Sequence, residues 1–175
     1  MDLPRTDALN ALPAESFAAA LAPLFEGAHG FLHRLAGTRP FDSDAALVAA
    51  AREAAAVAPE EELVELLDAH PRIGADPAEM SDLSRGEQDD RAPDVEALAQ
   101  ELADLNAAYE QRFGFRYVVF VAGRPRAAIA PLMEIALRNE RDAELRRGVD
   151  DVIYIAGDRL RSIRGATDGT QEIGE

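Results

Sequence analysis

The stretch SDAALVAAAREAAAV, residues 43–57, decides the fold class of this chain. Alanine has the highest helix propensity, and the leucine and valine residues recur at helical spacing. Ser43 is suited to cap the N-terminus of such a helix. The stretch PAESFAAALAPLFEG, which begins at Pro13, has the same pattern. Both stretches therefore predict amphipathic helices.

Further helices are predicted along the rest of the chain. EEELVELLDAH (60–70) follows Pro59 and opens with three glutamates, which suit a helix N-terminus. After Pro93, apolar residues at helical spacing from Val95 to Tyr109 predict a helix that ends near the GF pair of RFGF (112–115), and two more are expected after Pro125. His70 then lies at a helix end, because Pro71 disfavours helical geometry for the residue before it.

Only YVVFVAG, residues 117–123, has strand propensity. A single strand cannot form a sheet, so this segment either lies extended across helices or forms buried irregular backbone. The predicted fold is all-α, a compact single-domain helical bundle with one extended or irregular segment around 117–123. Residues 1–165 are expected to form the domain, and residues 166–175 a flexible acidic tail.

The charge of the chain bears on its partners. Its 33 acidic side chains against 18 basic ones give a net charge of −15. Such a surface repels nucleic acid, and an anionic substrate would need a local arginine cluster. The chain contains no run of 18 apolar residues, and its first residues lack the pattern of a signal peptide. We expect a cytoplasmic protein with neither nucleic acid nor a membrane as partner.

The chain has no lysine, cysteine or tryptophan. Without lysine there is no Schiff base and no attachment point for pyridoxal phosphate, biotin or lipoate. Without cysteine there is no thiolate nucleophile, disulfide or thiolate metal site. Acid–base chemistry near neutral pH therefore falls first to His29, His33 or His70.

Two motifs around His70 and Ser84 each have a functional and a purely structural interpretation. In LLDAHPRIG, residues 66–74, His70 could carry a proton in a cleft, or it could simply interact with the helix dipole. In SRGEQ, residues 84–88, Glu87 and Gln88 could hold a polar ligand. Ser84 and Glu87 also fit a capping box, and the two interpretations are compatible because a helix N-terminus attracts anions.

HGFLH places His29 and His33 four residues apart, a spacing that can bind zinc. A metalloprotease helix would carry glutamate after the first histidine, whereas this chain has Gly30 and offers no evident third ligand. We expect no metal site. In GDRLR, Arg159 and Arg161 form on composition alone the basic end of a final helix.

Taken together, five segments resemble the OHCU decarboxylase family in the correct order over nearly the whole chain. They are LNALPAESFAAALAPLFEG (9–27), HPRIG (70–74), SRGEQ (84–88), LNAAYEQRFGFRYVVFVAGR (105–124) and IAGDRLRSI (155–163). The resemblance implies an all-α fold, no cofactor, a homodimer and a small-molecule ureide substrate. The implied reaction is decarboxylation of 2-oxo-4-hydroxy-4-carboxy-5-ureidoimidazoline (OHCU) to (S)-allantoin and CO₂ in uric acid degradation.

The same resemblance assigns the site. His70 becomes the catalytic proton carrier and Glu87 its acidic companion. The substrate contacts implied are Pro71, Ser84, Arg85, Gly86, Gln88, Tyr117, Val118, Val119, Phe120, Val121 and Arg159.

This chain departs from relatives at three places. It has GAHGF (27–31) where relatives often carry a Ser-Pro-Trp-like sequence, Arg116 where proline is common, and Tyr117 in place of phenylalanine. The alternatives are a relative acting on another ureide, a histidine-based metal hydrolase, and a non-catalytic acidic helical module that binds a partner.

Overall fold

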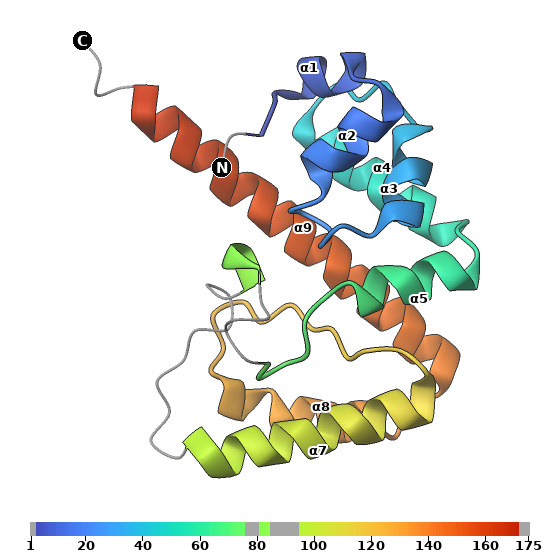
Figure 1. The fold of residues 1–175 in the computed structure, drawn as a ribbon, viewed down its shortest axis with the longest axis vertical. Helices are drawn as coiled ribbons and strands as arrows, with labels where there is room; N and C mark the ends of the chain where they lie inside the picture. The colour runs from blue at the N-terminus through green and yellow to red at the C-terminus, as the bar shows by residue number, and fades with distance from the viewer. Residues whose placement is uncertain (1–2, 76–80, 85–94, 172–175) are drawn as a thin grey trace. The chain divides into compact units, whose positions relative to one another are not determined.

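The computed structural model of this chain describes residues 3–75, 81–84 and 95–171, and these contain helices and no strand (Figure 1). The predicted all-α fold is thereby confirmed. Among the described residues, no helix is both long enough and apolar enough to cross a membrane.

The chain divides into two compact units, which we describe separately. Unit 1 holds the described residues up to Leu66 and from Ile153 onward, and unit 2 holds Leu67–Val152. The long helix α9 (Arg141–Gln171) contributes residues to both units. It includes residues 166–171, which were expected to begin a tail, whereas residues 172–175 lie outside the described part.

Unit 1 consists of short helices and the C-terminal part of α9 (Figure 1). The helices predicted from Pro13 and Ser43 are present, and the side chain of Ser43 caps the second by accepting a hydrogen bond from the amide of Ala46 at 3.1 Å. The first is shorter than expected and gives way to turns over 22–27, which include Pro23. The elements are α1 (Thr6–Ala11), α2 (Ala14–Leu21), α3 (His29–Ala36), α4 (Asp44–Ala56) and nearly all of α5 (Glu60–Asp68).

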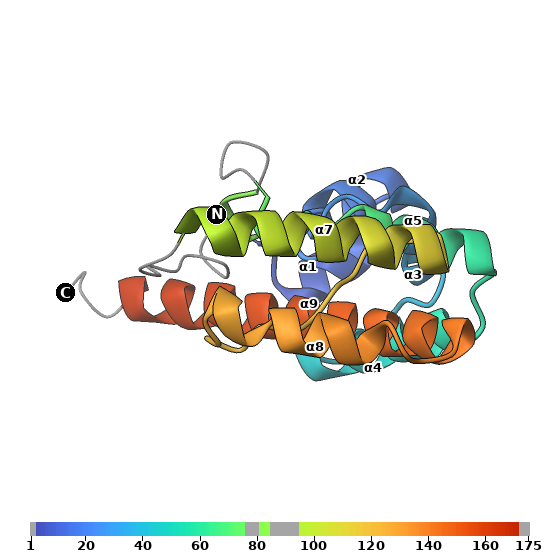
Figure 2. The same ribbon diagram turned by 90° about the horizontal axis from the view of Figure 1, so that it is seen from below.

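Unit 2 is built around an aromatic cluster at the end of α7 (Val95–Phe113). The ring of Tyr109 lies 4.6 Å from Phe113, 5.9 Å from Phe115 and 5.0 Å from Tyr117, centroid to centroid. Figures 1 and 2 show α7 running side by side with α8 (Ala130–Ala136), which follows a short 3₁₀ turn at Arg126–Ala128.

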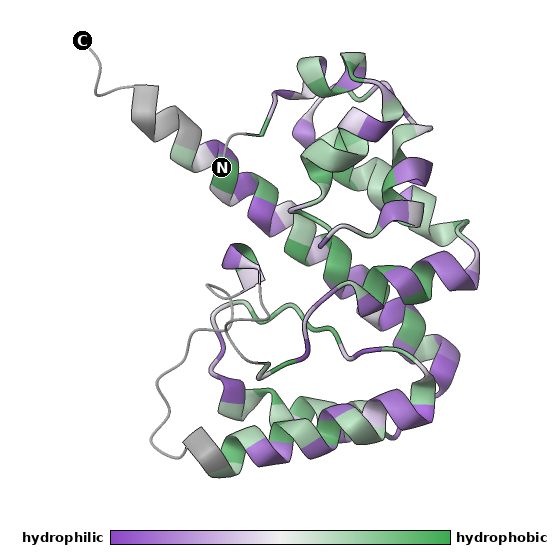
Figure 3. Cartoon of the chain, viewed as in Figure 1, coloured by the Kyte–Doolittle hydropathy of each residue, from purple (hydrophilic) through white to green (hydrophobic). Residues whose placement is uncertain are grey.

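The segment 117–123 forms neither a helix nor a strand, as expected for an extended or irregular segment, and its first three residues are buried. Tyr117, Val118 and Val119 are buried, and Figure 3 shows this part of the chain mainly in the colours of hydrophobic residues. The segment ends in a turn at Ala122 and Gly123, whose φ angles are 51° and 74°. Its β-branched residues favour extended backbone, but the described residues offer no strand to pair with.

We predict that Gly74→Ala will lower the free energy of unfolding by about 1–2 kcal/mol, because Gly74 has a φ of 79° that L-residues adopt at a cost. An added Cβ would also lie 3.1 Å from Cδ1 of Leu102. Gly165→Ala is the matched control, since nothing lies within 4 Å of a Cβ at that helical position. It should raise stability by about 0.5–1 kcal/mol. Urea denaturation measures both, and a shift of the same sign in both variants would contradict this account.

Candidate active site

His70 lies immediately beyond the C-terminus of α5, as predicted. Its amide donates to the carbonyl of Leu67 at 3.1 Å, which closes the last turn of the helix. The residue is 3% exposed, although it lies in a connecting segment. A histidine buried in a turn has its backbone fixed while its ring can face a site, which is the arrangement that proton transfer requires.

The turn that follows His70 is attached to α7 by two side chains. Arg72 forms a bidentate ion pair with Glu110, in which Nε lies 2.6 Å from Oε1 and Nη2 lies 2.8 Å from Oε2. The hydrogen bond from Arg72 lowers the pKa of Glu110 below its usual value. Asn106 Nδ2 donates to the carbonyl of Ile73 at 2.9 Å. These hydrogen bonds to α7 therefore fix the position of the HPRIG turn.

Arg116 connects this turn to the irregular segment 117–121. Its amide donates to Oδ1 of Asp68 at 2.8 Å, and its guanidinium donates to the carbonyl of His70 at 2.9 Å. The structure thus brings the beginning of one predicted substrate-binding segment to the backbone of the predicted proton carrier.

The buried carboxylate of Glu144 organises the side chains that bind the segment 117–121. Glu144 is completely buried and accepts hydrogen bonds from Tyr109 Oη at 2.6 Å, Asn139 Nδ2 at 2.7 Å and Arg147 Nε at 2.9 Å. Burial and the hydrogen bond to Glu144 raise the pKa of Tyr109. Burial lowers the pKa of Arg147, but Glu144, Tyr117 and Tyr109 together raise it above its usual value, so the guanidinium stays charged.

Arg147 and Asp151 hold the backbone of the segment directly. Arg147 Nη1 donates to the carbonyl of Val118 at 2.9 Å, and its guanidinium carbon lies 4.7 Å from the ring centroid of Tyr117. Asp151 accepts from the amide of Phe120 and pairs with Arg147 at 2.7 Å. These residues were not predicted from the sequence, although the spacing of Glu144, Arg147 and Asp151 along one helix is typical of side chains that interact.

The backbone of the segment is only partly hydrogen-bonded within the described residues. Among the described residues no hydrogen-bond partner is present for the amides of Val119 and Val121. The carbonyls of Phe120 and Val121 accept from the Arg124 side chain, at 2.5 and 3.0 Å.

Ser84, another predicted substrate contact, is buried and has helical backbone, as do the two residues before it. Its amide donates to Ser81 Oγ at 3.1 Å. Four other predicted site residues lie outside the described residues: Arg85, Gly86, Glu87 and Gln88.

Arg159 belongs to unit 1 and is buried there. Its Nη1 donates to the carbonyl of Pro23 at 3.0 Å, and its Nη2 forms an ion pair with Glu26 at 2.8 Å. The side chain is 2% exposed. The guanidinium therefore holds the turn after α2 in place, and a role toward substrate stays a prediction.

His29 and His33 both lie in α3 of unit 1. The described residues contain no group of three or more histidine, aspartate or glutamate side chains that could hold a metal ion. His33 Nε2 instead lies 3.4 Å from the exposed carboxylate of Glu15.

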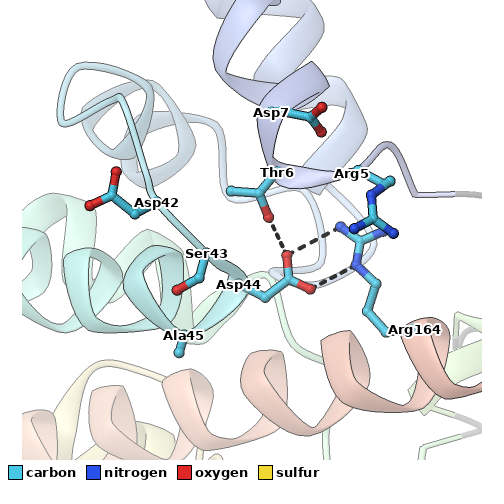
Figure 4. A pocket seen from close by; sticks show the side chains of 8 residues that line it. All are labelled: Arg5, Thr6, Asp7, Asp42, Ser43, Asp44, Ala45 and Arg164. Atoms are coloured by element: carbon cyan, nitrogen blue, oxygen red, sulfur yellow. Dashed lines mark hydrogen bonds and ion pairs between the residues drawn. The ribbon is translucent and has the colours of Figure 1, made fainter.

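A polar cavity of about 510 Å³ in unit 1 contains none of the predicted site residues (Figure 4). In it Asp44 accepts from Thr6 and pairs with Arg164 Nε at 2.8 Å. Arg164 also donates to the carbonyls of Leu3 and Pro4. These contacts attach the N-terminal segment to α4 and α9, which accounts for the cluster without a ligand.

A family model described as OHCU decarboxylase matches residues 10–161. The chain belongs to the OHCU decarboxylase family. The 2-oxo-4-hydroxy-4-carboxy-5-ureidoimidazoline decarboxylase of Haloferax volcanii is 34% identical over 156 residues, which cover 87% of this chain and 91% of that protein. The protein of the same name from Halalkalicoccus jeotgali is 31% identical over 168 residues, which are 94% of each chain.

A solved structure supports the OHCU decarboxylase fold. A crystal structure of OHCU decarboxylase in the presence of (S)-allantoin has a TM-score of 0.67 to this chain, at 20% sequence identity. The match covers 87% of this chain and 98% of that one.

The raised pKa of Tyr117 should make the free energy of unfolding depend on pH in the alkaline range. Burial raises its pKa from the usual value of about 10 to about 12, although the charge of Arg147 opposes the shift. The folded state then retains a proton that the unfolded state loses, so stability should fall as the pH rises from about 10 to about 12. Urea denaturation across this range measures the slope, and Tyr117→Phe should reduce it without abolishing it, because the raised pKa of Tyr109 contributes to the same fall. An unchanged slope in that variant would exclude Tyr117 as the cause.

Replacing Arg159 and replacing Arg161, the two arginines of GDRLR, should have very different effects on stability. Arg159→Ala removes the partner of the Glu26 carboxylate, which is 10% exposed, and should lower the free energy of unfolding by about 3–5 kcal/mol. The side chain of Arg161 is 72% exposed, so Arg161→Ala should lower the free energy of unfolding by about 0.5 kcal/mol or less. If Arg159 also binds substrate, Arg159→Lys should keep partial activity in the folded protein, and Arg159→Ala should lose most of it. Thermal melts and steady-state kinetics below the melting temperature separate the two roles. Kinetic losses that only follow stability would remove Arg159 from the site.

Proposed function

We propose that this protein decarboxylates OHCU to (S)-allantoin and CO₂ in uric acid degradation. Family membership supports the reaction, and the relatives compared above bear the name of this decarboxylase. The observation that supports the site is the buried His70, whose backbone Arg116 joins to the segment 117–121.

The substrate provides the route for the electrons. Its carboxylate is attached to a carbon that bears a hydroxyl group and adjoins a C=N bond. When the C–COO⁻ bond breaks, its electron pair forms a C=C bond and the C=N pair moves to nitrogen, which takes a proton. Loss of the hydroxyl proton and protonation of the ureide-bearing carbon then give allantoin. The C=N bond of the substrate accepts the electron pair that an electron-sink cofactor would otherwise accept, so we propose that the reaction needs no cofactor.

In this proposal His70 transfers the hydroxyl proton, and Glu87 orients the His70 ring or tunes its proton affinity. Pro71 and the residues Ser84–Gln88 contact the substrate beside His70. The free amides of Val119 and Val121 suit the carbonyl oxygens of a ureide. Arg159 supplies positive charge for the carboxylate, which a chain of net charge −15 otherwise repels.

Delivery of a proton to one face of the enediol-like intermediate accounts for the S configuration. We further propose that the protein acts in the cytoplasm as a homodimer.

The decisive experiment replaces His70. His70→Asn should leave the melting temperature nearly unchanged and reduce turnover roughly 10²- to 10⁴-fold, which is the usual loss when a general acid–base group is removed. Freshly generated OHCU is supplied, and optically active allantoin is followed by circular dichroism, because the uncatalysed decay gives a racemate.

His29→Asn is the matched control and should keep wild-type turnover, since His29 lies in unit 1 and carries no proposed role. The wild-type protein is also assayed with a chelator. Wild-type production of (S)-allantoin by His70→Asn would refute the assignment of His70. Loss of activity on chelation would contradict cofactor independence. A panel of other purine-derived ureides tests the rival substrate class.

A further inference from the structure

Arg116 binds the turn that carries His70 through both its backbone and its side chain. The amide of Arg116 donates to Oδ1 of Asp68 at 2.8 Å. Nη1 of the same residue donates to the carbonyls of Asp68 at 2.7 Å and of His70 at 2.9 Å. One residue thus makes three hydrogen bonds within a three-residue stretch, across 46 to 48 positions of sequence.

These carbonyls would otherwise lack a partner from the helix. The last carbonyls of a helix have no intrahelical donor, and α5 ends at Asp68. Pro71 has no amide hydrogen and cannot extend the helix by a further turn. A single guanidinium nitrogen of Arg116 therefore donates to two carbonyls that lack a backbone donor, those of Asp68 and His70.

The bond to the His70 carbonyl has a consequence beyond capping. It fixes the orientation of the peptide group that follows His70, while the bond from the His70 amide to Leu67 fixes the preceding one. With both flanking peptide groups held, the backbone angles of His70 are set, and with them the direction in which its Cα–Cβ bond leaves the chain.

We propose that Arg116 is a positioning residue for His70, which fixes the backbone of the proton carrier relative to the segment 117–121. This inference rests on the proposed role of His70. Arg116 is suited to the task because it directly precedes Tyr117, so the same residue sets the beginning of the segment and the direction of the histidine. A displacement of about 1 Å in such a site commonly costs up to about a hundredfold in rate.

Arg112 provides a matched control for a purely structural role. It lies in the same unit, and its guanidinium likewise donates to a backbone carbonyl, that of Asn139 at 3.2 Å. Arg112→Met therefore removes an arginine–carbonyl hydrogen bond of the same kind and the same positive charge, at a place that does not touch the HPRIG turn.

The test compares Arg116→Met, Arg116→Lys and Arg112→Met. Arg116→Met should lower kcat about 10- to 100-fold and change KM less than about twofold, with a melting temperature close to that of Arg112→Met. Arg116→Lys should recover most of kcat, because an ammonium group can still donate to both carbonyls. In NMR spectra, the ring signals of His70, assigned by their loss in His70→Asn, should shift in Arg116→Met and stay in place in Arg112→Met.

Equal kcat values in Arg116→Met and Arg112→Met would overturn the proposal, as would unmoved His70 ring signals in Arg116→Met. No recovery in Arg116→Lys would also count against it. Failure of the proposed function is a separate result, because it appears as full activity of His70→Asn. In that case the NMR comparison alone decides whether Arg116 positions the side chain.

Discussion

The buried carboxylate of Glu144 is the constraint on which unit 2 depends. A fully buried charge is tolerated only when it is paired and hydrogen-bonded, and Glu144 has Arg147, Tyr109 and Asn139 for this purpose. These partners come from α7, from the connection between α8 and α9, and from α9 itself. Because each must reach the same carboxylate, the three parts of the chain are held in one arrangement.

The irregular segment 117–121 takes its shape from this arrangement. Helices satisfy their own backbone groups, but an irregular segment must find partners elsewhere. Here Arg147 and Asp151 on α9 bind the carbonyl of Val118 and the amide of Phe120. The segment therefore has partners for part of its backbone without being a strand.

The proposed proton carrier is held by the same principle. The HPRIG turn is fixed from outside by Glu110 and Asn106 of α7, which bind Arg72 and the carbonyl of Ile73, and by Arg116 at the beginning of the irregular segment. Arginine takes part in most of these contacts, since its planar fork can bind several carbonyl or carboxylate oxygens at once. In a chain with 18 arginines and no lysine, part of the positive charge is thus committed to shaping the backbone.

The sequence by itself determined the helices, the helix end at His70 and the family. Alanine-rich periodicity, the Ser43 cap and Pro71 act through local backbone preferences, which need no knowledge of the rest of the fold. It also restricted the chemistry, because residue types that are absent cannot act. Only the tertiary structure decided that 117–123 is irregular, because strand propensity takes effect only where a partner strand exists.

The partners of Glu144, Arg116 and Arg159 were likewise decided by the tertiary structure. Their hydrogen bonds join residues up to 136 positions apart, and an arginine in a helical pattern looks the same whether it faces solvent or a buried carboxylate. Arg159 and Arg161 show this most directly, since they stand two positions apart in one helix, and one is buried while the other is exposed. Burial and partner choice depend on which elements pack together, and that is a property of the folded chain.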